Sequence, residues 1–402
     1  MTRTIGLIVA LELAVGTVGT STFGADRKSS TLAFLIAKSD LGVHYGKFEE
    51  ECPQGFEMTL EESYQASLTA AQREWMLRPE NSFEYGNAWK NDYLTGPGGT
   101  NVCSNPKSFK DDPRRRLYRG VSGTVAYGLN LDGTTDGRAT PTTCGHQKFE
   151  GLNGEPVVDN QLYRVSGCSK LNRGTERQTQ NYMGPFLVEL RGVDDLKNDD
   201  RVEMGVYSLA DGEVSLKTGD GSDVAYQTFT ITATPRWRAQ TTARIVDGVL
   251  MSEPIPVVRL SRAGGFGASR ALYEPASPNF VRVAEHEYRD VRFRLTVKPD
   301  GTFTGVMANY RPIDNIYLSQ YAGGRGTAST ANNDCAAEYN ALAKFADGYP
   351  DPVTGQCTAI SAAQNITGIP AFVVPPPRET LSAVRTGSAF AEAPADKSSA
   401  AK

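Results

Sequence analysis

Residues 186–209 read FLVELRGVDDLKNDDRVEMGVYSL, which places a short polar turn between two segments of alternating hydrophobicity. In the first segment, Phe186, Val188 and Leu190 fall on one face of an extended chain, and charged side chains fall on the other. Successive side chains of a β-strand point to opposite faces, so this pattern is typical of an antiparallel strand with one face in the core. The stretch therefore predicts a β-hairpin.

The same period of two recurs across residues 115–320, for example in RFRLTVK at residues 292–298. Asp-Gly pairs favour tight hairpin turns because both central residues of such turns take positive φ. They occur at Asp211-Gly212, Asp247-Gly248 and Asp300-Gly301. Hairpins at short spacing predict a mainly β chain in which residues 115–320 form an antiparallel β-sandwich or jelly-roll-like core.

Segments of a different character flank this β region. Residues 26–114 read as an N-terminal extension with a long loop and one amphipathic helix, which begins at a capping box on Thr59 and buries an apolar stripe reaching Trp75. Residues 321–373 combine a Gly-rich connection with a short, disulfide-pinned helical segment. Residues 374–402 lack apolar periodicity, which predicts a disordered tail.

The charge balance limits the partners that we expect. The chain of 402 residues carries 42 basic and 46 acidic side chains, a net charge of −4. Nucleic acid and anionic lipid attract proteins with a positive field, so neither is an expected partner.

The N-terminus has the order of a secretory signal. Arg3 precedes an apolar run from Ile5 to Val18, and small residues follow up to Ala25. This order predicts a signal peptide over residues 1–25 and a periplasmic or extracellular protein. The apolar run is shorter than the about 20 residues that cross a bilayer, so we expect no stable membrane span in the mature chain. A buried first strand or a short membrane anchor is the alternative.

Export changes the interpretation of the six cysteines, because an even number in an oxidising compartment usually forms disulfides. Short loop closure favours Cys335 with Cys357, which leaves two further pairs, Cys144 with Cys168 and Cys52 with Cys103. Free buried thiols are the alternative.

The sequence contains no complete catalytic motif. HEYRD at residues 286–290 lacks the second histidine of the H-E-x-x-H metalloprotease motif, and its surroundings alternate like a strand. We therefore expect His286 to be a structural residue. Neither a nucleophile elbow nor a phosphate-binding loop is present, so we do not expect an enzyme.

Oxygen-bearing side chains gather in three predicted turns. Calcium takes about six to eight oxygen ligands from carboxylates, amides and carbonyls. Turns that converge at one end of a sandwich would offer such a set, and the candidate ligands are Asp194, Asp195, Asp199, Asp200, Asp132, Asp136, Asp159 and Asn160. Solvated turns in which each aspartate bonds its own backbone are the alternative.

These features together predict an exported cell-envelope or extracellular module that binds a glycan or a protein partner and is stabilised by calcium. The alternative is a secreted hydrolase of glycans or esters that uses the carboxylates of the same turns, since a glycosidase needs two carboxyl groups about 5 to 9.5 Å apart in a cleft.

Overall fold

The computed structural model describes most of the chain between residues 29 and 376, namely 29–94, 106–109, 112, 118–152, 154–173, 185–263, 283–320 and 334–376. The predicted signal peptide, the Gly-rich connection and nearly all of the predicted tail lie outside these residues and stay predictions. Strands account for 40% of the structure and helices for 22%, so the predicted mainly β class is confirmed.

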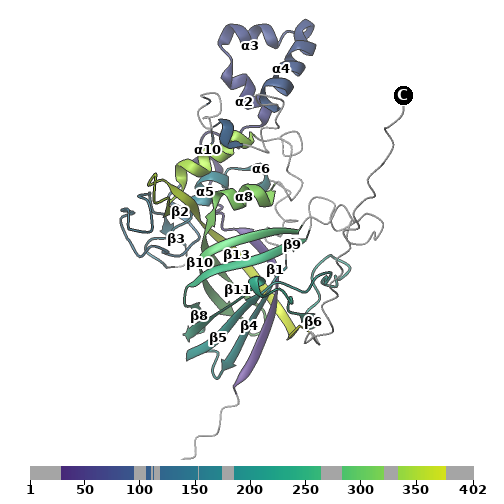
Figure 1. Ribbon diagram of the computed structural model, residues 1–402, viewed down its shortest axis with the longest axis vertical. Helices are drawn as coiled ribbons and strands as arrows, with labels where there is room; N and C mark the ends of the chain where they lie inside the picture. Colours follow the sequence, from purple (N-terminus) through teal and green to yellow (C-terminus); the bar gives the residue numbers. More distant parts are fainter. Residues whose placement is uncertain are drawn as a thin grey trace, which may run out of the picture.

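Eight antiparallel strands form a closed barrel (Figure 1). Each strand pairs with the next, and the last pairs with the first through contacts such as Ala33 with Ala371. In their order around the barrel, the strands are β1 (Ser30–Leu41), β4 (Leu187–Val193), β5 (Asp199–Tyr207), β7 (Arg238–Val246), β8 (Val249–Ser252), β10 (Val283–Val297), β11 (Phe303–Pro312) and β13 (Cys357–Val374).

The predicted sandwich or jelly roll is wrong, because this sheet closes on itself. Strands of a sandwich and of a barrel both bury one face, so alternation along a strand does not distinguish the two architectures. Closure depends on β1 and β13, which come from opposite ends of the described chain and outside residues 115–320. The predicted hairpin at residues 186–209 is present as β4 and β5, and Asp247 and Gly248 both take positive φ in the turn between β7 and β8.

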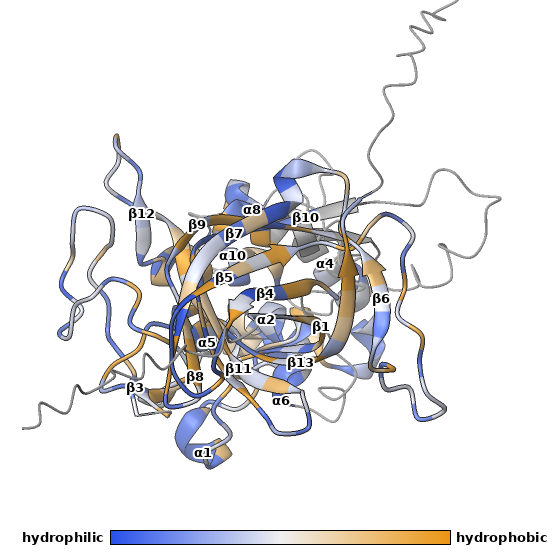
Figure 2. Cartoon of the chain, turned by 90° about the horizontal axis from the view of Figure 1, so that it is seen from below, coloured by the Kyte–Doolittle hydropathy of each residue, from blue (hydrophilic) through white to orange (hydrophobic). Residues whose placement is uncertain are grey.

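Apolar side chains pack inside the barrel. All eight strands contribute to a single buried cluster, which a closed barrel allows only on its inner face. Phe34 and Phe303 meet there edge to face with ring centroids 4.9 Å apart. Gly368 lies opposite Phe303, and a Cβ at Gly368 would come within 2.3 Å of the Phe303 ring. Figure 2, which looks from below, shows apolar and polar residues alternating along the strands.

Three further strands extend the barrel wall and two form a separate small sheet. β6 (Gln227–Thr230) and β12 (Gly348–Pro350) pair with β13, and β9 (Ile255–Ala263) pairs with β10. The small sheet consists of β2 (Val125–Ala126) and β3 (Glu150–Gly151).

Helices gather at one end of the barrel (Figure 1). They are α1 (Phe48–Glu51), α2 (Leu60–Ser67), α3 (Ala70–Met76), α4 (Ser82–Leu94), α5 (Gln161–Ser166), α6 (Lys170–Arg173), α8 (Ile313–Gln320) and α10 (Cys335–Phe345), with the short 3₁₀ turns η1 (Pro79–Asn81), η3 (Pro106–Phe109) and η6 (Pro235–Trp237). None of the described helices has both the length and the apolar character needed to cross a membrane.

The predicted amphipathic helix divides into two. The capping box on Thr59 begins α2 as expected, but a second capping box on Thr69 begins α3. The change of direction at Leu68 takes Trp75 off the buried stripe, and Trp75 is 45% exposed. The prediction that Trp75 belongs to the core is therefore wrong.

Two disulfides within the described residues join segments distant in sequence. Cys52 pairs with Cys168 and Cys144 with Cys357, so the predicted pairings of these four cysteines are wrong. The barrel topology places Cys357, the first residue of β13, beside the chain around Cys144, and this proximity outweighs the short loop closure used in the prediction. Cys335 is also disulfide-bonded.

Candidate functional site

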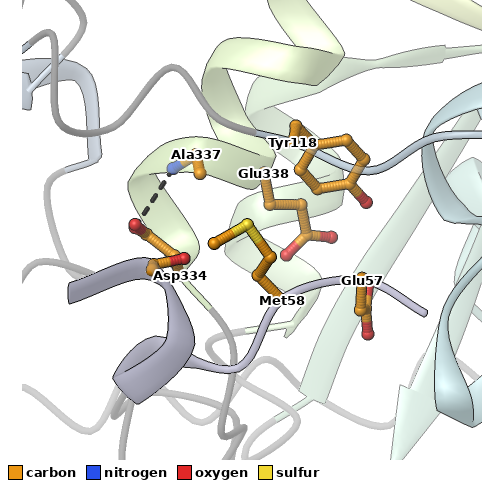
Figure 3. A pocket seen from close by; sticks show the side chains of 7 residues that line it. Glu57, Met58, Tyr118, Asp334, Ala337 and Glu338 are labelled. Carbon is orange, nitrogen blue, oxygen red and sulfur yellow. Dashed lines mark hydrogen bonds between the residues drawn. The ribbon is translucent and has the colours of Figure 1, made fainter. Parts of the chain in front are cut away.

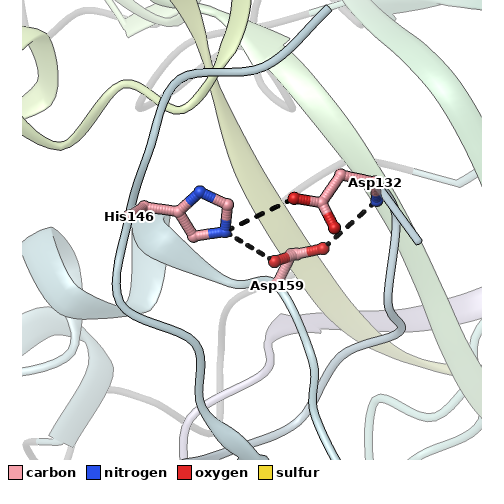
Figure 4. A group of neighbouring side chains, drawn as sticks. All are labelled: Asp132, His146 and Asp159. Atoms are coloured by element: carbon pink, nitrogen blue, oxygen red, sulfur yellow. Dashed lines mark hydrogen bonds and ion pairs between the residues drawn. The ribbon is translucent and has the colours of Figure 1, made fainter. Parts of the chain in front are cut away.

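Ionisable side chains from four separate segments meet in a buried cluster on the outside of the barrel wall. These side chains are at most 6% exposed. Figure 4 shows three of them, with His146 facing both carboxylates. We call this group the buried polar cluster, and its members are Asp132, His146, Lys148, Asp159 and Asp347.

A tight turn holds Asp132 in place. Gly133 takes a φ of 75° in this turn, and the Thr134 amide donates to Asp132 Oδ1 at 2.8 Å. Arg292 of β10 donates to the Asn130 carbonyl at 3.1 Å. Because Phe293 points into the barrel, its neighbour Arg292 points outwards and ties the turn to the outer surface.

The backbone of Cys144 orients His146. The His146 Nδ1 atom lies 3.0 Å from the Cys144 carbonyl oxygen, and the disulfide fixes Cys144 to Cys357 of β13. A carbonyl oxygen only accepts hydrogen bonds, so Nδ1 carries a proton. The Nε2 atom then faces Asp159 Oδ1 at 2.8 Å. Because a neutral Nε2 and a carboxylate are both acceptors, a second proton or a cation must lie between them.

Lys148 supplies positive charge to the cluster. Its ammonium donates to Asp132 Oδ1 at 2.5 Å and to Asp159 Oδ1 at 2.6 Å. The other oxygen of Asp159 accepts from the Leu131 amide at 2.7 Å. Buried charges are tolerated when they are paired and hydrogen-bonded, and Asp159 meets both conditions.

Only one of the two carboxylate oxygens of Asp347 accepts a hydrogen bond. Its Oδ1 atom accepts from the Ser361 amide at 2.6 Å. Its Oδ2 atom has no hydrogen-bond partner and lies 3.7 Å from His146 Nε2. The buried Tyr310 hydroxyl also has no hydrogen-bond partner. Such groups are uncommon in folded proteins because their desolvation is not compensated.

The environment shifts the pKa values of the cluster in different directions. Burial raises the pKa of Asp347 to about 7. Burial also opposes ionisation of Asp159, but hydrogen bonds from His146 and Lys148 outweigh it and lower the pKa of Asp159. Burial alone would lower the pKa of His146, whereas the hydrogen bond to Asp159 and the charge of Asp347 raise that pKa on balance. Burial and the surrounding carboxylates raise the pKa of Tyr310.

Of the four predicted ligands between residues 132 and 160, the structure brings together two. Asp132 and Asp159 both belong to the buried polar cluster. Asp136 pairs instead with the exposed Arg138. Asn160 is buried as the N-cap of α5, where its side chain accepts from the Tyr163 amide at 3.2 Å.

The predicted ligands at residues 194–200 lie at the end of the barrel away from the helices. Val193 pairs with Ser30, the first residue of β1, whereas the last residue of β1 leads to the helices. Asp199 accepts from the amides of Asp194 and Arg201 at 2.8 and 3.0 Å. Asp195 accepts from the Lys197 amide at 2.8 Å, and Asp200 lies in the same turn at the start of β5. The three oxygen-rich turns therefore do not converge.

His286 lies in strand β10, which agrees with the strand expected from HEYRD. Its side chain is buried, and Nη2 of Arg311 lies 3.4 Å from its Nδ1 atom.

A small acidic pocket lies near the start of α10 (Figure 3). Its volume is about 10 Å³, which is room for about one water molecule. The Asp334 carboxylate caps α10 by accepting from the amides of Ala336 and Ala337, both at 3.2 Å. This pocket is too small for an organic substrate.

His146, Lys148 and Asp347 were not predicted as site residues. The sequence gives no recognisable signal for these three residues, because their partners lie in other segments of the chain. Comparisons with known proteins add no assignment: no protein-family model, curated protein sequence or solved structure matches this chain.

Proposed function

We propose that the protein is an exported, non-catalytic binding module whose projecting helices engage a protein partner. The barrel serves as the scaffold, because apolar side chains from all eight of its strands pack together inside it. The two disulfides, Cys52 with Cys168 and Cys144 with Cys357, support an extracellular or periplasmic location.

The observation that carries this proposal is an exposed apolar tip on the helical projection. The tip runs from α3 through η1 to the start of α4, and α3 has no buried residue. Trp75 is 45% exposed, Leu77 50% and Phe83 75%. Large apolar side chains close together at the surface mark interaction sites, and aromatic residues are enriched at protein interfaces.

The charges around the tip favour a protein over a membrane surface. Arg73 and Arg78 are interspersed with Glu74, Glu80 and Glu84, so the tip lacks the positive field that attracts anionic lipid. Mixed charges around an apolar centre resemble the polar rim of a protein interface.

The hydrolase alternative has less support. The carboxylates of Asp132 and Asp159 are fully buried and bonded to Lys148. Asp199 already accepts two backbone amides in an exposed turn. A glycosidase needs its two carboxyl groups open to a cleft, and neither set meets this requirement.

Site-specific photo-crosslinking tests the proposal. Benzoylphenylalanine in place of Phe83 should give one discrete protease-sensitive adduct when the protein is irradiated in the cells that produce it. Phe372 provides a matched control because it is also a phenylalanine, 57% exposed, on barrel strand β13. Peptides of one other protein, found by mass spectrometry in the Phe83 adduct alone, would support the proposal.

Three outcomes would reject it: no adduct at position 83, the same adducts at positions 83 and 372, or an adduct that contains carbohydrate but no foreign peptide. The last outcome would indicate a glycan ligand. Substitution of Phe83 should leave the melting temperature unchanged because its side chain is mostly exposed, so loss of the adduct would not reflect unfolding.

A further inference from the structure

The orientation of His146 matches that of a metal ligand. Histidines that bind metals through one ring nitrogen usually donate the other N–H to a backbone carbonyl or carboxylate, which fixes the tautomer and the ring plane. His146 does this through Nδ1 and the Cys144 carbonyl at 3.0 Å. Its Nε2 atom is left facing the three carboxylates of the buried polar cluster.

The spacing of the candidate ligand atoms fits a tetrahedral ion. Zinc binds nitrogen and oxygen at about 2.0–2.2 Å, which places neighbouring ligand atoms of a tetrahedron about 3.3–3.6 Å apart. The distances from His146 Nε2 are 2.8 Å to Asp159 Oδ1, 3.7 Å to Asp347 Oδ2 and 4.0 Å to Asp132 Oδ2. Asp132, His146 and Asp159 each offer a ligand atom within 4.8 Å of the other two, and shifts of about half an ångström would bring the three distances from His146 Nε2 to the tetrahedral spacing.

Asp347 provides an independent indication of a missing ligand. Its side chain is 0% exposed, and its Oδ2 atom has no hydrogen-bond partner while it points at the imidazole. The imidazole at 3.7 Å compensates the desolvation of this oxygen only in part, because it makes no hydrogen bond to it, and a bound cation would provide the rest.

We propose that the buried polar cluster binds a zinc-class divalent cation through His146 Nε2 and one oxygen each of Asp132, Asp159 and Asp347. A nitrogen donor with three carboxylates suits zinc better than calcium, which prefers about six to eight oxygens. The ion would join the turn of Asp132, the segment of His146, the start of α5 and the segment before β12, and would therefore hold the helical end against the barrel.

The ammonium of Lys148 is the competing cation. It bonds to two of the carboxylates that the metal would use. Lys148 also borders an open surface hollow of about 530 Å³ that Glu150 and Glu155 line. Metal binding would exchange the two cations, with the ammonium moving to this hollow. Replacing Lys148 by an uncharged residue should therefore strengthen metal binding.

Calorimetric titration of chelator-treated full-length protein tests the site. Zinc chloride should bind the wild type with one high-affinity site, and calcium chloride should not compete. Zinc should bind Lys148→Met about tenfold or more tightly, since a like charge has been removed. Cobalt(II) in the same site should give the intense visible absorption of tetrahedral coordination.

The control variants separate this site from adventitious binding. His146→Gln and Asp347→Asn, each combined with Lys148→Met, should weaken zinc binding by at least about tenfold. Asp136→Asn should not alter it, because Asp136 lies outside the cluster. The proposal is overturned if neither wild type nor Lys148→Met binds zinc, if Lys148→Met gains no affinity, or if the double variants bind as tightly as Lys148→Met.

Discussion

At the scale of single residues, Asp159 organises the buried polar cluster. It accepts hydrogen bonds from the His146 imidazole, the Lys148 ammonium and the Leu131 amide. Removing one partner of a buried ion pair leaves the other charge desolvated and unpaired. The Lys148 ammonium therefore depends on Asp159 for its charge compensation in the buried cluster.

Asp159→Asn should lower the free energy of unfolding by about 3–5 kcal/mol in metal-free protein, because the Lys148 ammonium would lose a charged partner. Urea denaturation of the variant and the wild type measures the difference. Asp136→Asn is the control, since Asp136 is an exposed partner of Arg138, and it should change stability by less than about 0.5 kcal/mol. Equal stability of the two variants would show that the cluster contributes no net pairing energy.

At the scale of elements, the turn between β4 and β5 has two competing interpretations. The amides of Asp194 and Arg201 partly offset the charge of Asp199, and these hydrogen bonds lower the pKa of Asp199 against the opposing effect of burial. A bound calcium ion would offset the remaining negative charge. In a solvated turn, water alone would screen that charge.

The calcium hypothesis predicts that thermal melts in millimolar calcium and in chelator differ by several degrees. A ligand at a hundredfold excess over Kd stabilises the folded state by about 2.7 kcal/mol. The difference should shrink in the variant that combines Asp199→Asn with Asp200→Asn. If the wild-type melts superimpose and elemental analysis finds no calcium, the calcium hypothesis is wrong and the turn is solvated.

At the scale of the whole molecule, the filled barrel interior should dominate stability. Phe303 is fully buried against Phe34, whereas Phe372 is 57% exposed on a neighbouring strand of the same barrel. Phe303→Ala should cost about 3–5 kcal/mol through lost burial and the cavity that remains. The matched change Phe372→Ala should cost far less. Similar losses in the two variants, measured by denaturant unfolding, would contradict a packed interior.

Export is also a property of the whole molecule. The mature chain should begin between about Thr22 and Arg27, close after the apolar run at the N-terminus. N-terminal sequencing of protein recovered from the cell envelope or the medium checks this. A first residue of Met1 or Thr2 in that material would mean that the apolar run is not a cleaved signal.

The sequence by itself determined the elements that depend on neighbouring residues. Alternation predicted β4, β5 and β10, because period two is a local consequence of strand geometry. The Asp247-Gly248 turn and the capping box on Thr59 were predicted for the same reason, since each depends on a few adjacent backbone groups.

Only the tertiary structure decided which distant segments meet. Closure of the barrel by β1 and β13, the pairing of Cys144 with Cys357 and the meeting of His146 with Asp347 all join parts of the chain far apart in sequence. Local patterns are the same in a sandwich and a barrel, and spacing along the chain does not report distance in space. The cost of closing a long loop grows only slowly with its length, so packing and strand pairing outweighed the short connections that the sequence favoured.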